Sequence, residues 1–342
     1  MLAIKVLYAE EFVLHDPYPH EHIENPERLE TVLAVLKEFS GRLDISRPSS
    51  PPDLGVFAKA HEQGYVEWLL DKMRRASSVE FIDPDTYISP GTMKAVEALS
   101  SSIVEALESI EEASIVILGR PPGHHAGLKG PAMGAPTLGF CVFNTAATLA
   151  KLLSGRGRVA VLDFDLHHGN GSQEILWNSS RVYHIDIHQD PSTIYPGTGY
   201  PSQIGAYRNM ANIVVPPWSG DDIYEEALGE ALGIVSGIDP DYLVVSAGFD
   251  AYRDEPLTAM NVGSKFYWLL GSALNRAEAK LAIVLEGGYG LGLQNAWKAF
   301  ISGLLGKEDP IRDTYEISRP QTWEKFRENM EKLREHLGLG KT

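Results

Sequence analysis

The sequence is poor in cysteine and lacks long apolar runs. Its single cysteine, Cys141, excludes an internal disulfide framework and fits a reducing cytoplasm, so a cytoplasmic protein is expected. It also excludes a thiolate-rich zinc site, so any metal must be held by oxygen and nitrogen atoms. No stretch approaches the roughly 18 apolar residues of a membrane helix. The N-terminal residues MLAIKVLYAEEF lack the features of a secretory signal and predict a first β-strand.

Basic residues are also scarce relative to acidic ones. The chain has 30 Lys and Arg against 46 Asp and Glu, which gives a formal net charge of −16. This charge weighs against nucleic acid as a direct partner. It would attract cationic substrates, but many cytoplasmic proteins are acidic for solubility alone, and the solubility interpretation is favoured. With 44% apolar and 22% charged residues, the composition is that of an ordinary folded protein.

Short apolar runs alternate with helical patterns along the chain. Runs rich in Val, Ile and Leu, typical of strands covered on both faces, occupy residues 4–9, 114–119, 158–165, 182–188, 211–216, 242–248 and 281–288. Helical patterns occupy residues 26–39, 91–109, 144–153 and 222–238. This alternation predicts an α/β fold with a mostly parallel sheet of about eight strands and helices on both faces.

The length of 342 residues allows two average domains or one large one. Neither an internal repeat nor a low-complexity linker divides the chain, so one domain over residues 1–342 is favoured. Residues 306–342 are charged and have a helical pattern, and we expect them to form a C-terminal helical tail packed on that domain. Ligands of a parallel sheet bind at the carboxyl ends of the strands, where chemistry is therefore expected.

Polar side chains cluster at such strand ends. Asp163, Asp165 and His167 alternate after the run at 158–165, and alternation on a strand would send their side chains to one face. Each alone is best explained as a strand-end cap or a core histidine. Together, and read with Asp250 after the run at 242–248, they predict a divalent-metal site of a hydrolase. Two carboxylates and an imidazole that leave a position open are typical of catalytic zinc.

Eight motifs in order extend this pattern over most of the chain. They are ENPERL (24–29), DTYISPGT (85–92), RPPGHHA (120–126), GFCVFNTAA (139–147), DFDLHHGNG (163–171), YPGTG (195–199), SAGFDAY (246–252) and EGGYG (286–290). This series resembles the histone deacetylase family, which includes acetylpolyamine amidohydrolases and shares the arginase-like fold. The resemblance implies a zinc-dependent deacylase, and its details follow from matching positions.

The resemblance implies a role for each matched residue. The zinc ligands would be Asp165, His167 and Asp250. A structural K⁺ would be held by Asp163, Asp165, His167, Asp186 and Ile187. Catalysis would use the tandem pair His124 and His125, with His125 as base and His124 held by Asp163, and Tyr289 as oxyanion donor. Gly139, Phe140 and Tyr195 would line an acyl-lysine tunnel. Asp85 is expected to grip substrate at the rim, although a plain turn residue is an equal interpretation.

Two positions, Asn170 and Asp186, depart from the most common family pattern. Asn170 stands where many members have an aspartate behind the second tandem histidine, as in the class II and polyamine branches. A neutral amide raises the pKa of His125 less than a carboxylate would, which favours a neutral base. Asp186 replaces a serine at the K⁺ site, so the identity of that ion is open. Gly169 and Tyr252 occupy the places of arginase's additional carboxylates, which predicts a mononuclear site.

The sequence therefore predicts a zinc-dependent amidohydrolase that removes acyl groups, principally acetyl, from acylated lysine or polyamine-type amines. A protein that binds acyl-lysine without turnover and a binuclear manganese ureohydrolase are the weaker alternatives. The choice between protein and polyamine substrates, the acyl length, Zn²⁺ or Fe²⁺ as the metal, and the oligomeric state, a homo-oligomer included, are left open.

Overall fold

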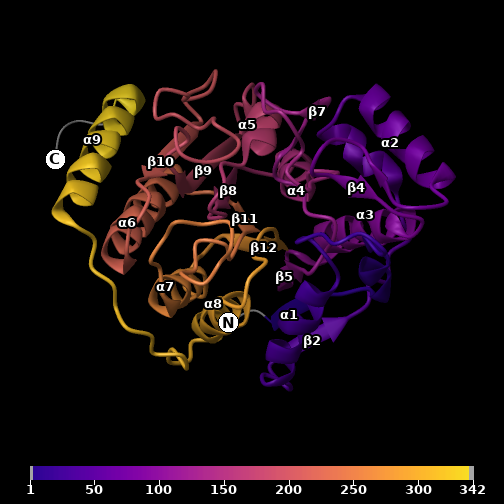
Figure 1. Cartoon of the computed structure of the whole chain (residues 1–342), viewed down its shortest axis with the longest axis horizontal. Coiled ribbons are helices and arrows are strands. Elements are labelled where there is room, and N and C mark those ends of the chain that lie inside the picture. The colour runs from indigo at the N-terminus through magenta and orange to yellow at the C-terminus, as the bar shows by residue number, and fades with distance from the viewer. Residues whose placement is uncertain (1–2, 339–342) are drawn as a thin grey trace.

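The computed structural model describes residues 3–338, which are built around one eight-stranded sheet (Figure 1). The strands lie in the order β10-β9-β8-β11-β12-β5-β1-β2, and every neighbouring pair is parallel. Their bounds are β1 Ala3–Leu7, β2 Leu43–Ser46, β5 Ala113–Ile117, β8 Val159–Asp163, β9 Val182–Gln189, β10 Met210–Val215, β11 Tyr242–Ala247 and β12 Lys280–Leu285. The predicted parallel α/β fold is confirmed.

Helices cover both faces of this sheet, with α3, α4 and α5 on one side and α6, α7 and α8 on the other (Figure 1). The α-helices are α1 Glu27–Lys37, α2 Gln63–Arg75, α3 Thr92–Ser109, α4 Thr145–Leu153, α5 Asn170–Leu176, α6 Asp221–Ile238, α7 Ser264–Leu274, α8 Leu293–Leu304 and α9 Pro320–Leu337. The short elements are the 3-10 helices η1 Glu10–Leu14 and η2 Leu54–Lys59, and two hairpins formed by β3 Glu80–Phe81 with β4 Tyr87–Ile88 and by β6 Ala126–Gly127 with β7 Gly130–Pro131.

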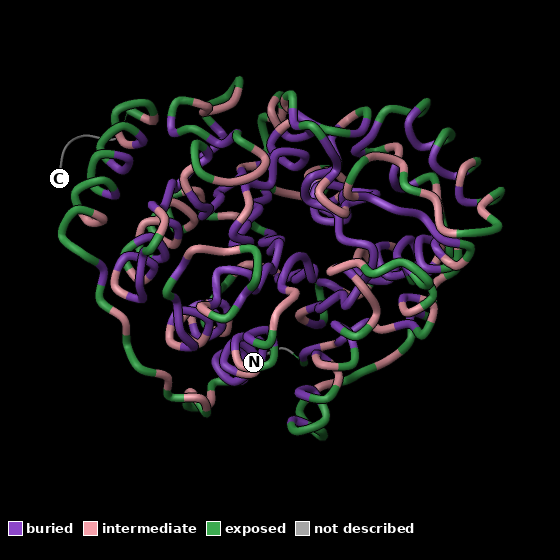
Figure 2. The backbone as a smooth tube through the Cα atoms, viewed as in Figure 1, coloured by how far each residue is buried: buried purple, intermediate pink, exposed green. Residues whose placement is uncertain are grey.

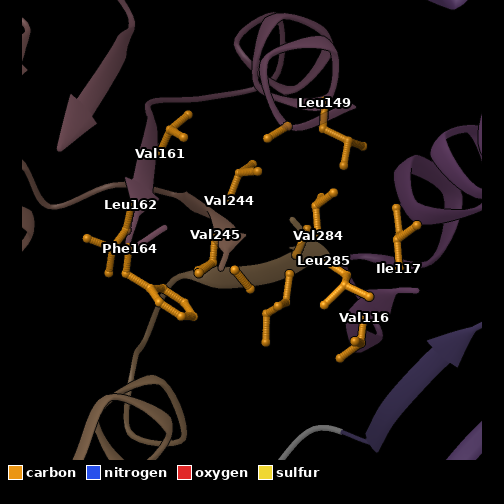
Figure 3. Packing of buried hydrophobic residues seen from close by; sticks show 14 of the residues in the cluster. Val116, Ile117, Leu149, Val161, Leu162, Phe164, Val244, Val245, Val284 and Leu285 are labelled. Carbon is orange, nitrogen blue, oxygen red and sulfur yellow. The ribbon is translucent and has the colours of Figure 1, made fainter. Parts of the chain in front are cut away.

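The central strands form because both of their faces are buried. Every residue of β8, β10 and β11 is buried, as the purple centre of Figure 2 shows. Their Val, Ile and Leu side chains pack against those of neighbouring strands and of α4, for example Val161, Val244 and Leu149 (Figure 3). A strand buried on both faces needs apolar side chains at every position, which explains why the apolar runs in the sequence did not alternate.

Seven of the eight sheet strands were predicted, and β2 was not. Its residues, LDIS, are partly or fully exposed at the edge of the sheet, so they lack the apolar run of a central strand. Within the predicted tail, α9 lies along β10 (Figure 1), where Phe326, Met330 and Leu333 are buried. The end of the tail, 339–342, lies outside the described residues. The assignment of a single domain stays a prediction.

Within residues 3–338, none of the helices combines the length and the apolarity needed to cross a bilayer. The cytoplasmic location stays a prediction.

The strand order positions the polar motifs. β8, β11, β12 and β5 are consecutive in the sheet, so the segments that follow them meet at one edge. These segments contain DFDLHHGNG, GFDAY, EGGYG and RPPGHHA. The candidate site is therefore assembled from four neighbouring strand ends, as is usual for parallel sheets.

Candidate active site

Asp165, His167 and Asp250 converge at this edge. The Nδ1 atom of His167 lies 2.8 Å from Oδ2 of Asp250 and 3.2 Å from Oδ1 of Asp165. One ligand atom from each residue lies within 4.8 Å of the others, and both carboxylates are buried. This donor set, two carboxylate oxygens and one imidazole nitrogen, fits Zn²⁺ or Fe²⁺. The three predicted zinc ligands are thus brought together.

The local backbone differs from the one predicted. β8 ends at Asp163, so Asp165 and His167 do not alternate on a strand, and that part of the prediction was wrong. They lie in the turn that follows, where the Asp165 amide donates to Oδ1 of Asp163 over 3.1 Å and the His167 amide donates to Oδ1 of Asp165 over 2.9 Å. The carboxylates themselves satisfy these amides, so the turn and not the strand pleat makes the side chains converge.

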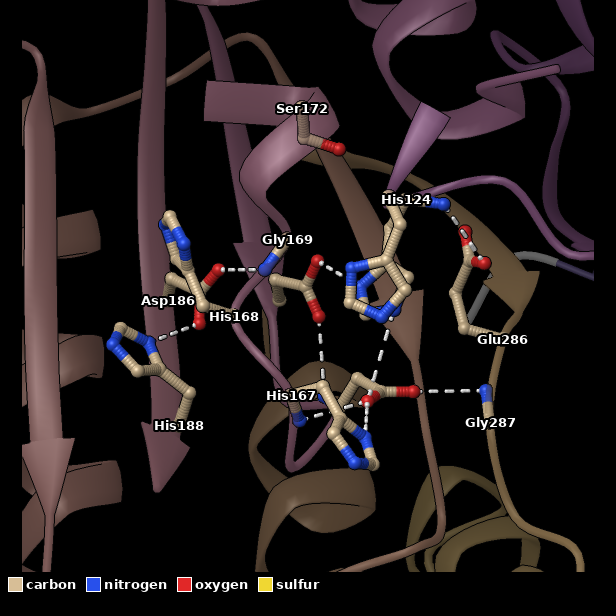
Figure 4. A network of polar contacts seen from close by, with 12 residues as sticks. His124, His167, His168, Gly169, Ser172, Asp186, His188, Glu286 and Gly287 are labelled. Carbon is tan, nitrogen blue, oxygen red and sulfur yellow. Dashed lines mark hydrogen bonds and ion pairs between the residues drawn. The ribbon is translucent and has the colours of Figure 1, made fainter. Parts of the chain in front are cut away.

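Backbone amides from neighbouring segments fix both carboxylates. Leu166 donates its amide to Oδ1 of Asp250 over 2.8 Å. Gly287 donates its amide to Oδ2 of Asp165 over 2.9 Å (Figure 4). A Cβ atom at Gly287 would lie 2.4 Å from Oδ2 of Asp165 and 2.8 Å from Oδ2 of Asp250. Only glycine therefore lets the backbone after β12 approach the metal ligands this closely.

The tandem histidines have opposite electrostatic environments. His124 places Nδ1 3.1 Å from Oδ2 of Asp163. Burial lowers the pKa of His124, but the charges of Asp165 and Asp163 outweigh burial and raise it well above its ordinary value. Burial, with the charges of His124 and His167, lowers the pKa of His125 well below its ordinary value. The two shifts therefore have opposite signs, favouring the charged form of His124 and the neutral form of His125.

Asn170 sets the tautomer of His125. The Nδ1 atom of His125 lies 2.7 Å from Oδ1 of Asn170, whose Nδ2 donates to the carbonyl of Ala132 over 3.0 Å. Because Oδ1 of an amide only accepts, Nδ1 of His125 carries the proton and Nε2 is the basic nitrogen. The two rings of the tandem pair lie 4.0 Å apart, and the ring of His125 lies 6.1 Å from that of His167. His125 is therefore a neutral base beside the three candidate ligands.

Tyr289 follows a sharp bend in the segment after β12. Gly288 has a φ of +110°, in the region that favours glycine. The ring of Tyr289 packs edge-on against Phe140 at 5.4 Å, with the guanidinium of Arg28 over its face at 4.4 Å. Burial raises the pKa of the Tyr289 phenol well above its ordinary value, so the hydroxyl keeps its proton and can donate it. The amide of Tyr289 donates to Oε1 of Glu255 over 2.8 Å.

The supports of Tyr289 were missed by sequence reasoning, although they lie in quoted motifs. Arg28, in ENPERL, donates through Nε to the carbonyl of Gly288 over 2.7 Å. Glu24, four residues earlier, pairs with Arg28 and with the buried Arg120 of RPPGHHA. A buried charged residue requires a partner of opposite charge. On that principle, Glu24 could have been paired with Arg28 and Arg120 from the sequence.

The predicted tunnel residues also lie at this site. The ring of Tyr195 stands 4.9 Å from that of His125, and its hydroxyl donates to the carbonyl of Thr137 over 2.9 Å. A Cβ atom at Gly139 would lie 2.5 Å from Cδ2 of His125, so glycine lets this loop pass beside the base. Phe140 follows with a φ of +71°. Aromatic rings thus flank His125 and Tyr289.

Asp85 is held by two threonine hydroxyls, one local and one from a distant segment. Its carboxylate accepts from the hydroxyls of Thr137 over 2.6 Å and Thr86 over 2.8 Å. Asp83 accepts the amides of Asp85 and Thr86, as expected of a turn. These bonds support the turn interpretation of Asp85, and its contact with substrate stays a prediction.

The residues predicted to hold K⁺ are also close together. Asp163 and Asp186 are directly paired across β8 and β9, with Ile187 next along β9 and with Asp165 and His167 in the turn after β8. Oδ1 of Asp186 lies 2.6 Å from Nδ1 of His188, and Oδ2 accepts the amide of Gly169 over 2.9 Å (Figure 4). The position can hold a cation, but its second carboxylate makes it more negative than a site completed by a serine hydroxyl.

The family profile described as the histone deacetylase domain matches residues 22–304, and the chain belongs to this family. A probable deacetylase of Methanothermobacter thermautotrophicus is 34% identical, over 89% of this chain and 91% of that protein. Acetylpolyamine amidohydrolase 1 of Pseudomonas aeruginosa is 36% identical, over 78% of this chain and 86% of that protein.

A solved structure agrees with these relationships. The crystal structure of the HD domain of HDA15 superimposes with a TM-score of 0.84 at 27% identity, covering 98% of this chain and 95% of that chain. The resemblance inferred from the eight motifs is therefore confirmed at the level of the family and the fold. The roles of individual residues stay predictions.

Replacing Gly287 by Ala tests whether metal binding depends on the close approach of the Gly287 backbone to Asp165 and Asp250. The new methyl group would displace Asp165 and Asp250, so we expect zinc affinity to fall by about tenfold to a hundredfold, the usual cost of disturbing a ligand's supporting bond. Competition with a chromophoric chelator measures this affinity. Gly229→Ala in α6, where a Cβ meets nothing within 4 Å, is the matched control. Unchanged affinity in Gly287→Ala would show that the ligand set does not depend on this contact.

Proposed function

We propose that the protein is a zinc-dependent amidohydrolase that removes acyl groups, principally acetyl, from linear amines of the acyl-lysine or acylpolyamine type. One observation carries this proposal. A neutral imidazole with a defined basic nitrogen, His125, lies between the three candidate metal ligands and an aromatic wall. Amide hydrolysis needs a base beside the metal, and the family relationship supports acylated amines as the substrate class.

Each group then has a chemical task. Zinc, when held by Asp165, His167 and Asp250, supplies Lewis-acid polarisation of the amide and activation of water. His125 takes a proton on Nε2 and delivers it to the departing amine. Tyr289 donates a hydrogen bond from its hydroxyl to the developing oxyanion, where a fixed donor stabilises the transition state more than the substrate.

The remaining site residues hold this machinery in place. His124 remains charged between Asp163 and Asp165, where it offsets part of the buried negative charge. Phe140 and Tyr195 flank the position of a narrow aliphatic chain and exclude water from it. The family description, histone deacetylase domain, supports lysine-type substrates, and the name of the Pseudomonas aeruginosa relative supports polyamine-type substrates, so a substrate panel must distinguish them.

The first experiment measures acetate release from acetyl-lysine peptides and from acetylpolyamines. The protein is compared as purified, after removal of metal with a chelator, and after reloading with Zn²⁺. We expect release to disappear with the metal and to return on reloading. Absence of chelator-sensitive release from every acylated amine would contradict the proposal. Binding of acyl-lysine without product would instead support a recognition protein, and two catalytic Mn²⁺ ions would support a ureohydrolase.

Replacement of Tyr289 by Phe tests the proposed oxyanion donor. The ring and its contacts with Phe140 and Arg28 are preserved, so only the hydroxyl is lost. We expect kcat to fall by about a hundredfold to a thousandfold, because one fixed donor contributes this much in related sites. Zinc content, measured in parallel, should be unchanged. Unaltered turnover would remove Tyr289 from the mechanism.

Replacement of Asn170 by Asp tests the neutrality of His125. A carboxylate beside Nδ1 would stabilise the imidazolium and raise the pKa of His125. Since activity requires the neutral ring and is lost as pH falls through this pKa, we expect the acidic limb of the kcat/KM profile to move to higher pH. Asn275→Asp, at the end of α7, adds the same charge elsewhere and serves as control. An acidic limb that does not move would rule out His125 as the titrating base.

A further inference from the structure

His184 on β9 is a buried histidine without hydrogen-bond partners. Its side chain is 0% exposed, and neither Nδ1 nor Nε2 has a hydrogen-bond partner among the described residues. An imidazole always has polar nitrogens to satisfy, and leaving them unpaired in the interior costs free energy. By contrast, the buried His61 uses both of its ring nitrogens, with the carbonyl of Gly127 and the amide of Asn144.

Two buried carboxylates lie beside this unpaired ring. Asp186 is two residues further along β9, so its side chain lies on the same face of the sheet as that of His184. Asp163 is the direct partner of Asp186 on β8. Nε2 of His184 is 3.7 Å from Oδ2 of Asp186, and one ligand atom from each of the three residues lies within 4.8 Å of the others.

Other imidazoles orient the two carboxylates. Oδ2 of Asp163 contacts Nδ1 of His124 at 3.1 Å, and Oδ1 of Asp186 contacts Nδ1 of His188 at 2.6 Å (Figure 4). Ligands of metal sites are commonly held by such outer partners. A Cβ atom at residue 169 would lie 2.5 Å from Oδ2 of Asp163 and 3.3 Å from Oδ2 of Asp186, so Gly169 leaves free the space that a side chain would occupy between them.

The negative charges of Asp163 and Asp186 also favour a bound cation. Within residues 3–338, the ion-pair partners of Asp163 and Asp186 are imidazoles and include no lysine or arginine. Two buried carboxylates across one strand pair repel each other unless positive charge is placed between them. A donor set of two carboxylates and one imidazole suits a divalent transition-metal ion, since nitrogen donors are uncommon for alkali ions.

We propose that Asp163, His184 and Asp186 bind a structural divalent transition-metal ion, Zn²⁺ being the first choice, which joins β8 to β9 behind the candidate active site. This ion differs from the K⁺ predicted from the family resemblance, whose set was Asp163, Asp165, His167, Asp186 and Ile187. His184 is not part of that set, and its ring adds a nitrogen donor between the two carboxylates. It does not depend on the proposed hydrolysis.

The experiment counts zinc per chain by inductively coupled plasma mass spectrometry after dialysis against zinc and then zinc-free buffer. We expect about two ions in the unaltered protein and about one in His184→Gln, which removes a nitrogen ligand. Asp250→Ala, which disables the candidate catalytic trio, should retain about one ion. His61→Gln replaces a buried histidine outside the site and should retain about two.

Folding is checked by circular dichroism, and Asp186→Ser provides a second variant. It replaces the carboxylate by the hydroxyl found in the common family pattern, and we expect it to lose the second zinc while its Tm becomes dependent on K⁺. One zinc in both the unaltered protein and His184→Gln would overturn the proposal. Competition at this position by K⁺ or Tl⁺, with no second divalent ion, would overturn it as well. Because the zinc content of Asp250→Ala is measured without an activity assay, a failure of the proposed hydrolysis would be a separate result.

Discussion

The structure depends on how buried negative charge is compensated at the carboxyl edge of its sheet. Four aspartates, Asp163, Asp165, Asp186 and Asp250, are each at most 1% exposed there. Their ion-pair partners within the described residues are imidazoles. Isolated buried carboxylates are unstable, so this arrangement needs positive charge, which charged histidines and the proposed metal ions would supply. The fold thereby concentrates buried negative charge at the carboxyl ends of its central strands.

The same requirement divides the work of the tandem histidines. His124 faces carboxylates, which raise its pKa, whereas the pKa of His125, beside the neutral amide of Asn170, is lowered. Neighbouring groups whose pKa values are pushed apart are typical of acid–base sites. This difference supports the proposed roles, in which His124 contributes charge and His125 acts as the base. The close approach of Gly287 and the bend at Gly288 precede Tyr289, whose ring lies against Phe140 and under the guanidinium of Arg28.

Much of the fold was predictable because central strands of a parallel sheet need apolar side chains at every position, as in β8 and β11. The exposed edge strand β2 has no such pattern. Motif order identified the candidate ligands. The turn that makes Asp165 and His167 converge, however, depends on hydrogen bonds from backbone amides to carboxylates, which the alternation of side chains along a strand does not reveal. The roles of Arg28, Glu255 and His184 arise from contacts between distant segments, and only the assembled structure brings those segments together.

We propose that a cation compensates the negative charge of the carboxylates at the candidate site. X-ray diffraction from zinc-loaded crystals, recorded just above and just below the zinc absorption edge, tests it most directly. We predict an anomalous peak between Asp165, His167 and Asp250, with all three side chains as ligands. An electron-density map without such a peak, in which His167 remains hydrogen-bonded to both carboxylates as it is here, would contradict the account.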